Sequence, residues 1–322
     1  MAFNELGGKC LLACEIREHA RQVYKANFEV DHPFPYDITE VPEIPECDIV
    51  CAGFPCQSFS VGGLQKGLDD ERGQLYTHIV RLCKETPPKA LFLENVKGLI
   101  KLQGGRVLSK IEADFEGIGY KLRCYETDVR EWNIPQPRKR VFLIGFKEGG
   151  AIKPPLPPYS LGNVRKFGVY TGTYSLNDLM KEAGVLEKDE ECVREIHRTL
   201  RGKDGDRPGK WPDGYTRLPV ESVEVKKLET AYSLTGTRTG KGDNARSKRT
   251  MGIYDVMREG GPEDTYPKEV NDLAAKLLMG FPKDFRIDAT FRSYRRPLLG
   301  NAVVPRTVKP YCEAILKVLR DQ

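Results

Sequence analysis

A cysteine follows an apolar run within a segment that has the composition of an active-site loop. Cys56 lies in the sequence GFPCQSFS, directly after the apolar residues 48–52, which predict a buried strand. Ligands of open α/β sheets bind beyond the carboxyl ends of the strands, and the proline before the cysteine would fix the local backbone. The position favours Cys56 as a nucleophile, although a cysteine at a strand end is more commonly an inert buried thiol.

Three further polar motifs flank apolar runs. Glu94 lies near the end of the run ALFLENV, the sequence QPRKR at 136–140 precedes the run VFLIGF, and GNAVVP at 300–305 precedes the last apolar helix. Alternate residues of an extended segment share a face, so we expect Arg138 and Arg140 to face one anion together. Each motif also has an ordinary explanation, as a solvated strand end, a basic surface cluster or a turn.

The elements that must position these residues alternate between strand and helix patterns. Short apolar runs predict buried strands, and apolar residues at helical spacing predict amphipathic helices. This alternation is typical of an α/β fold with a doubly wound, mostly parallel sheet and helices on both faces. Strands are expected at 10–16, 48–52, 90–93 and 141–146, and helices at 17–28, 74–84, 108–118, 273–279 and 308–319.

The pattern divides the chain into three parts. Residues 1–150 form the predicted catalytic domain, and a connection with four prolines then starts a middle region, 151–270. This region contains five basic residues between 238 and 249 against Asp243 alone. Such a run is usually a solvated loop, and beside a nucleic-acid site it would contact phosphates. Residues 271–322 are expected to return to the catalytic domain.

Composition excludes several classes of protein. Of 322 residues, 39% are apolar and 30% are charged, which argues against disorder, and no stretch approaches the roughly 20 apolar residues that span a bilayer. The N-terminal residues lack the pattern of a secretory signal, and nine cysteines are most simply explained as reduced thiols. These features predict an intracellular protein, in cytoplasm, nucleoid or nucleus. The net charge of +5 is compatible with a polyanionic partner.

In their order along the chain, the motifs resemble those of the cytosine-C5 DNA methyltransferase family. The matches are PCQ at 55–57, ENV at 94–96, QxRxR at 136–140 and GNxV at 300–303, and they leave out the start of the chain and 151–270. The resemblance implies the fold of S-adenosylmethionine-dependent methyltransferases with a smaller, irregular target-recognition domain. It also implies methyl transfer from S-adenosylmethionine to C5 of cytosine in duplex DNA, in a restriction–modification or regulatory role.

The resemblance assigns four catalytic residues. Cys56 would attack C6 of the cytosine, and Glu94 would hydrogen-bond or protonate N3, which requires a carboxyl group with a raised pKa. Arg140, together with Arg138, would stabilise charge near O2 with a fork geometry that lysine lacks. A base inside a duplex is out of reach, so the target cytosine must be flipped out.

The resemblance also implies contacts to the cofactor and to DNA. Glu15 would bind the ribose hydroxyls, and Asp37 would contact the adenine. The complete expected cofactor set is Glu15, Ile16, Asp37, Ile38, Phe54, Pro55, Leu75, Asn301, Ala302 and Val303. The expected DNA-binding set is Gln57, Ser58, Ser60, Thr237, Arg238, Lys241, Arg246, Lys248 and Arg249.

The family's first strand and its FxGxGG loop have no match in this sequence. Residues 1–8 resemble the end of the helix that follows that loop. In the family's topology this strand is central, and unpaired buried backbone groups beside it would cost roughly 1–3 kcal/mol each. We therefore expect a truncated or split enzyme that binds S-adenosylmethionine weakly on its own. A separate N-terminal fragment or subunit would supply the strand.

Two other functions stay open. The first is a tRNA cytosine-C5 methyltransferase on the same fold, although the sizeable middle region favours a DNA sequence reader. The second is a truncated, non-catalytic DNA-binding remnant. No metal is expected, because the CxxxC pairs at 10–14 and 47–51 lie in apolar runs with no histidine at ligand spacing.

Overall fold

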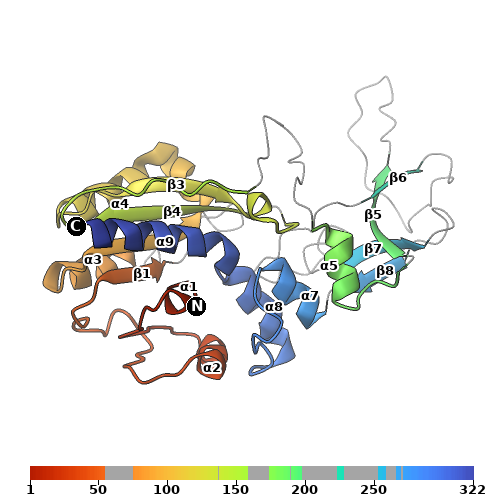
Figure 1. Cartoon of the computed structure of the whole chain (residues 1–322), viewed down its shortest axis with the longest axis horizontal. Coiled ribbons are helices and arrows are strands. Elements are labelled where there is room, and N and C mark those ends of the chain that lie inside the picture. The colour runs from red at the N-terminus through yellow and green to blue at the C-terminus, as the bar shows by residue number, and fades with distance from the viewer. Residues whose placement is uncertain are drawn as a thin grey trace, which may run out of the picture.

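A computed structural model describes residues 1–54, 75–136, 138–158, 174–188, 190–197, 223–227, 253–258, 266–269 and 271–322, with the backbone alone for the four strand segments between 190 and 269. The main body is a four-stranded sheet with helices packed on it (Figure 1). A second four-stranded sheet lies at the other end of the molecule, beyond the helices α5, α7 and α8 (Figure 1).

The main sheet has the strand order β1-β2-β4-β3. β1 and β2 are parallel and pair Gly53 with Glu94, whereas β4 runs antiparallel to both β2 and β3. The α/β class is confirmed, and the described sheet is mixed because β3 and β4 are joined by a short connection, which suits antiparallel neighbours. The strands are β1 Ile49–Gly53, β2 Ala90–Val96, β3 Arg123–Asp128 and β4 Lys139–Phe146.

Different helices bury the two faces of this sheet. Side chains alternate along a strand, so Leu91 and Leu93 pack in the cluster of α3 and α4, whereas Phe92 packs in the cluster of α1 and α9. α9 begins at Pro305, and proline is favourable at the first helical position because its missing N–H has no helical partner there. The helices and 3₁₀ helices of this body are α1 Ala2–Glu5, α2 Glu18–Asn27, α3 Tyr76–Glu85, η3 Lys97–Gly105, α4 Arg106–Glu116, η4 Val129–Trp132 and α9 Pro305–Asp321.

The strand expected at 10–16 is wrong. This segment is extended but forms no strand, and Leu11 and Ile16 are 40% and 64% exposed. Ala13 and Glu15 donate main-chain hydrogen bonds to a loop that follows α2, and these bonds are too few to form a ladder. An apolar run becomes a buried strand only when neighbouring strands cover its edges and helices cover its faces.

Among its described residues, the middle region contains a second sheet. Its strands pair antiparallel in the order β6-β5-β7-β8. α5 begins with a capping box at Ser175, and α7 begins with an Asn271 side-chain cap, as is common for helix N-termini. The elements are α5 Leu176–Glu182, β5 Glu190–His197, β6 Val223–Lys227, β7 Ile253–Arg258, β8 Tyr266–Glu269, α7 Asp272–Leu278 and α8 Arg292–Asn301.

A third core joins the end of the chain to the main body. α5, α7 and α8 contribute Leu179, Leu278 and Leu299, and this cluster also takes in Val23 of α2 and Val129 of η4. The C-terminal helices therefore hold α2 and η4 in place. No helix within the described ranges is long and apolar enough to cross a membrane.

Candidate active site

A carboxylate and a guanidinium form an ion pair where the end of β2 lies beside the start of β4. Arg140 Nε lies 2.9 Å from Glu94 Oε1, and each side chain is 17% exposed. β2 pairs with β4 so that Val96 is opposite Arg140 and Glu94 is opposite Phe142, which places both charged side chains on one face of the sheet. The sequence placed these two residues 46 positions apart in different motifs, and the sheet brings them into contact.

Burial controls the protonation of this carboxylate. Loss of hydration raises the pKa of Glu94 above its ordinary value, and the nearby Arg140 and Arg138 guanidinium groups oppose part of that rise. A carboxyl group whose pKa is raised can hold a proton closer to neutral pH, which suits a general acid. The direction agrees with the chemistry expected for Glu94.

The chain that leads to Cys56 passes beside this ion pair at Gly53. A side chain at Gly53 would meet Glu94 Oε2 at 3.6 Å, so this glycine leaves room beside the carboxylate. Asn95 is buried and its Nδ2 donates to the carbonyl of Phe54 at 3.4 Å, which anchors the start of the loop. Cys56 itself lies outside the described residues, as do Pro55, Gln57, Ser58 and Ser60.

Arg138 has a different position from the one expected. Its guanidinium group is 2% exposed and donates to the carbonyls of Gly300 and Ala302 at 2.9 and 2.6 Å. Arg138 precedes β4 rather than lying in it, so the alternation that would place it beside Arg140 does not apply. Arg138 thus holds the turn between α8 and α9, while its charge still acts on the Glu94 carboxylate that pairs with Arg140.

Gln136 makes a similar long-range contact. Its Nε2 donates to the carbonyl of Leu278 at 3.1 Å, and the residue is fully buried. Gln136 and Arg138 thus connect the segment before β4 to the ends of α7 and α8. The QxRxR motif divides into two connecting residues and one residue, Arg140, at the ion pair.

Replacing Arg138 by lysine should lower the free energy of unfolding by about 1–3 kcal/mol. An ammonium group can reach one of the two carbonyls but cannot bridge both, so a buried acceptor loses its donor. Urea unfolding measures the change, with Arg123→Lys, at an exposed position on β3, as the control expected to stay within about 0.5 kcal/mol. Equal stability of the two variants would contradict this role of Arg138.

The expected ribose and adenine residues lie on two neighbouring segments. Glu15 N donates to the carbonyl of Pro35 at 3.3 Å, which brings the segment before α2 beside the segment that leads to Asp37. The pKa of the Cys14 thiol is raised by burial and then by the Asp37 and Glu15 carboxylates, so both carboxylates are close enough to Cys14 to affect its ionisation. Two carboxylates on neighbouring segments are suitable acceptors for the hydroxyl and amino groups of a nucleoside.

The other expected cofactor residues have varied surroundings. Ile16 and Asn301 are exposed, and Leu75 is half-buried. Ile38 and Phe54 pack in the α3/α4 cluster, Ala302 packs against the α5/α7/α8 cluster and Val303 packs against the α9 cluster. The expected DNA-binding residues of the middle region lie outside the described residues; they are Thr237, Arg238, Lys241, Arg246, Lys248 and Arg249.

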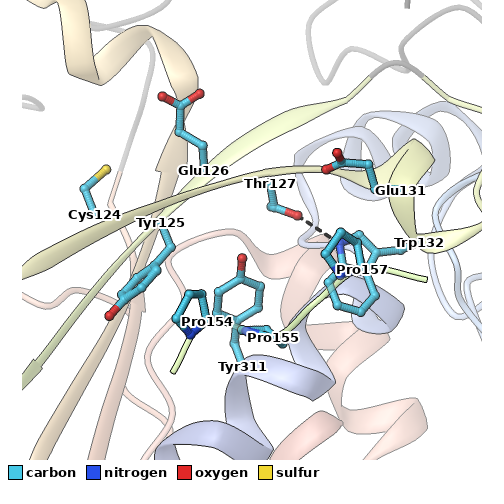
Figure 2. Close-up of a pocket in the computed structure, with 10 residues that line it drawn as sticks. All are labelled: Cys124, Tyr125, Glu126, Thr127, Glu131, Trp132, Pro154, Pro155, Pro157 and Tyr311. Atoms are coloured by element: carbon cyan, nitrogen blue, oxygen red, sulfur yellow. Dashed lines mark hydrogen bonds between the residues drawn. The ribbon is translucent and has the colours of Figure 1, made fainter. Parts of the chain in front are cut away.

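A cavity of about 390 Å³ lies beside the ion pair rather than at it. Tyr125, Trp132 and Tyr311 form its aromatic walls, and the proline-rich connection closes one side (Figure 2). Trp132 Nε1 donates to Thr127 Oγ1 at 3.1 Å, which fixes the indole ring. Neither Glu94 nor Arg140 lines this cavity.

One buried arginine near the cofactor segments gave no signal in the sequence. Arg21, on α2, is 4% exposed and donates to main-chain carbonyls of both segments. An arginine on an amphipathic helix predicts a solvated side chain, so only the three-dimensional contacts identify it.

The fold and the ion pair define a class of α/β enzyme with an acidic and a basic group at the strand ends, and comparisons with known proteins identify the family. The family model for C-5 cytosine-specific DNA methylases matches residues 1–317, and the chain belongs to this family. The type II methyltransferase M.NlaX of Neisseria lactamica is 42% identical over 328 residues, covering 100% of this chain and 93% of that protein.

Two further comparisons agree. The type II methyltransferase M.HhaI of Haemophilus parahaemolyticus is 38% identical over 315 residues, covering 94% of this chain and 86% of its own length. Among solved structures, a DNMT2 mutant of Spodoptera frugiperda superposes with a TM-score of 0.61 at 14% identity, covering 98% of this chain and 95% of that one. That likeness supports the fold alone.

Proposed function

We propose that this chain uses Cys56, Glu94 and Arg140 to methylate C5 of a cytosine that has been flipped out of duplex DNA. The observation that carries this proposal is the Glu94–Arg140 ion pair, which lies beside Gly53 at the start of the Cys56 loop. The family is that of cytosine-C5 DNA methylases. S-adenosylmethionine, the methyl donor that this family implies, supplies an electrophilic methyl group.

The three residues would act on the pyrimidine ring in sequence. The Cys56 thiolate bonds to C6, and the displaced electron pair moves toward N3 and O2, so that C5 becomes nucleophilic. Glu94 donates a proton or hydrogen bond at N3, while Arg140 stabilises negative charge near O2 and holds the Glu94 carboxyl group. After C5 has taken the methyl group, it loses its proton and the sulfur leaves C6, which restores the aromatic ring.

The cofactor is proposed to lie against the two segments before and after α2. Glu15 would bind the ribose hydroxyls and Asp37 the adenine, because both carboxylates act on the charge of Cys14 from neighbouring segments, which the buried Arg21 guanidinium connects. Thr39 N donates to Asp37 Oδ1 at 2.8 Å, which fixes that carboxylate and holds its pKa below its usual value.

The function is tested by methyl incorporation. Labelled S-adenosylmethionine should deliver methyl groups to cytosine C5 of duplex DNA and not to tRNA. Incorporation into tRNA alone would favour the RNA-directed alternative. Salt-dependent DNA binding without incorporation, even when a strand that pairs with β1 is supplied, would favour the non-catalytic remnant.

Target recognition is proposed for the middle region. Its β5–β8 sheet offers a rigid support, and the basic residues from Arg238 to Arg249 would contact the phosphates. Gln57, Ser58 and Ser60 would contact the flipped nucleotide. A role in restriction–modification, within a cell compartment that contains DNA, follows from this activity.

We also propose that a separate polypeptide segment pairs with the open edge of β1. β1 pairs with β2 on one side, and among the described residues no strand pairs with its other side. Parallel strands are normally buried on both faces, whereas Cys51 and Gly53 of β1 are exposed. The exposed apolar residues Leu11 and Ile16 belong to the segment expected as a strand, which lacks a ladder. An extended apolar strand is the partner that these unpaired backbone groups would bind.

This arrangement predicts weak cofactor binding by the chain alone. Calorimetric titration of the 322-residue chain with S-adenosylmethionine should show no saturation at micromolar concentrations. Addition of a fragment that carries a strand and a glycine-rich FxGxGG loop should restore binding, because the loop supplies main-chain donors for the cofactor. Micromolar affinity of the chain alone would contradict the split-enzyme proposal.

A further inference from the structure

The guanidinium group of Arg21 connects the two segments on which the cofactor proposal depends. Arg21 Nη1 lies 3.2 Å from the carbonyl oxygen of Glu15 and 2.8 Å from that of Pro35. Its Nη2 lies 2.6 Å from the carbonyl oxygen of Phe34. One side chain thus donates to the segment before α2 and to the segment after it.

Two aromatic rings fix the plane of this guanidinium group. Its central carbon lies 3.9 Å from the ring centre of Phe34 and 3.7 Å from that of Tyr36. The hydroxyl group of Tyr36 donates to Glu18 Oε2 at 2.9 Å, and Glu18 Oε2 lies 3.9 Å from Arg21 Nε. Lysine could not replace this arginine, because an ammonium group has no planar fork of donors and no flat face to stack between two rings.

The carbonyls that Arg21 binds belong to residues next to the proposed ligands. Glu15 is itself an expected ribose contact, and Phe34 and Pro35 lie within three residues of Asp37. The Glu15 carboxylate accepts from Arg17 N at 2.8 Å, so its side chain is oriented by the start of α2 as well. Arg21 therefore holds the two carboxylate-bearing segments together, alongside the main-chain hydrogen bonds of Ala13 and Glu15.

We propose that Arg21 is a positioning residue that fixes the nucleoside-binding segments in the geometry the cofactor requires. This inference rests on the proposed function, since it takes Glu15 and Asp37 as cofactor ligands. Arg21 does not touch the reacting atoms, because its guanidinium is enclosed by main-chain carbonyls and aromatic rings. Its loss should weaken cofactor binding and leave the chemical step unchanged.

The first test measures local opening by hydrogen exchange in the whole chain. In Arg21→Gln and Arg21→Lys, the amides of Ala13 and Glu15, which donate to the carbonyls of Pro33 and Pro35, should exchange at least tenfold faster. Amides of the main sheet should keep the exchange rates of the wild type. Lys25→Gln, at an exposed position on the same helix, is the matched control and should change neither set.

The second test separates binding from chemistry. Methyl transfer to duplex DNA, with the β1-completing fragment present, should show a KM for S-adenosylmethionine raised about tenfold in both Arg21 variants, with kcat within about twofold of the wild type. Unchanged exchange at Ala13 and Glu15, or a KM equal to that of Lys25→Gln, would overturn the proposal.

The two tests also distinguish failure of the inference from failure of the function. If the wild type transfers no methyl group even with the fragment, the proposed function fails, whereas the exchange rates still decide whether Arg21 holds the segments. If Arg21→Gln exchanges faster at every amide, we examine Arg21→Lys. Faster exchange confined to Ala13 and Glu15 in Arg21→Lys supports the positioning role, whereas faster exchange at every amide in both variants shows a role in general stability and overturns it.

Discussion

Replacing Cys56 by serine should abolish methyl transfer while DNA binding persists. A hydroxyl group is far less ionised than a thiol near neutral pH, so the bond to C6 cannot form at a useful rate. We expect the rate to fall at least about a thousandfold, as is usual when a covalent nucleophile is removed. The measurement is incorporation of labelled methyl groups into duplex DNA, with a gel-shift assay for binding.

The control for this variant is Cys47→Ser, which alters a half-buried thiol ahead of β1. It should retain methyl transfer within about twofold, since nothing in the proposed chemistry uses it. Substantial transfer by Cys56→Ser would remove the assignment of Cys56. Loss of DNA binding along with transfer would mean that the substitution disturbs the loop rather than the chemistry.

Glu94→Gln should lower kcat about a hundredfold and change its dependence on pH. Glutamine keeps the size and can donate a hydrogen bond, but it has no proton to transfer to N3. The pKa of Glu94 is raised by burial, so the protonated, active form persists to higher pH and activity should fall as the pH rises through that pKa. The rate in the variant should lose this alkaline fall, because an amide does not titrate.

The matched control is Glu126→Gln on β3. Glu126 is exposed and forms an ion pair with Lys97, on the opposite face of the sheet from Glu94. The Glu126→Gln variant should leave both kcat and the pH profile unchanged. It loses only an exposed ion pair, which contributes little to stability. A persistent alkaline fall in Glu94→Gln would show that another group is the acid.

Much of the main body could be predicted from the sequence. The apolar runs that became β1, β2 and β4 and the amphipathic stripes that became α3, α4 and α9 follow from the periodicity of burial. Glu94 was identified because it lies near the end of one such run, and Arg140 because it lies directly before another. The two residues meet because β2 and β4 are antiparallel neighbours, which places the end of β2 beside the start of β4.

Other features depend on contacts that a local pattern does not contain. The segment 10–16 has the composition of a strand, but no described strand pairs with it, so it has no ladder of main-chain hydrogen bonds. Arg138 belongs to a basic motif, yet it binds carbonyls more than 160 residues away. Arg21 resembles a surface arginine until the loop with Phe34 folds over it. In each case a distant part of the chain determines the environment.

The long-range contacts of Gln136 and Arg138 also bear on how the protein is made. Their partners lie at the ends of α7 and α8, 142 to 164 residues further along the chain. A ribosome that has released β4 has not yet synthesised these partners, so the segment before Arg140 cannot adopt its final form. Because contacts between residues so far apart in sequence form late, the nascent chain should acquire the final geometry around Arg140 only after α8 has left the ribosome.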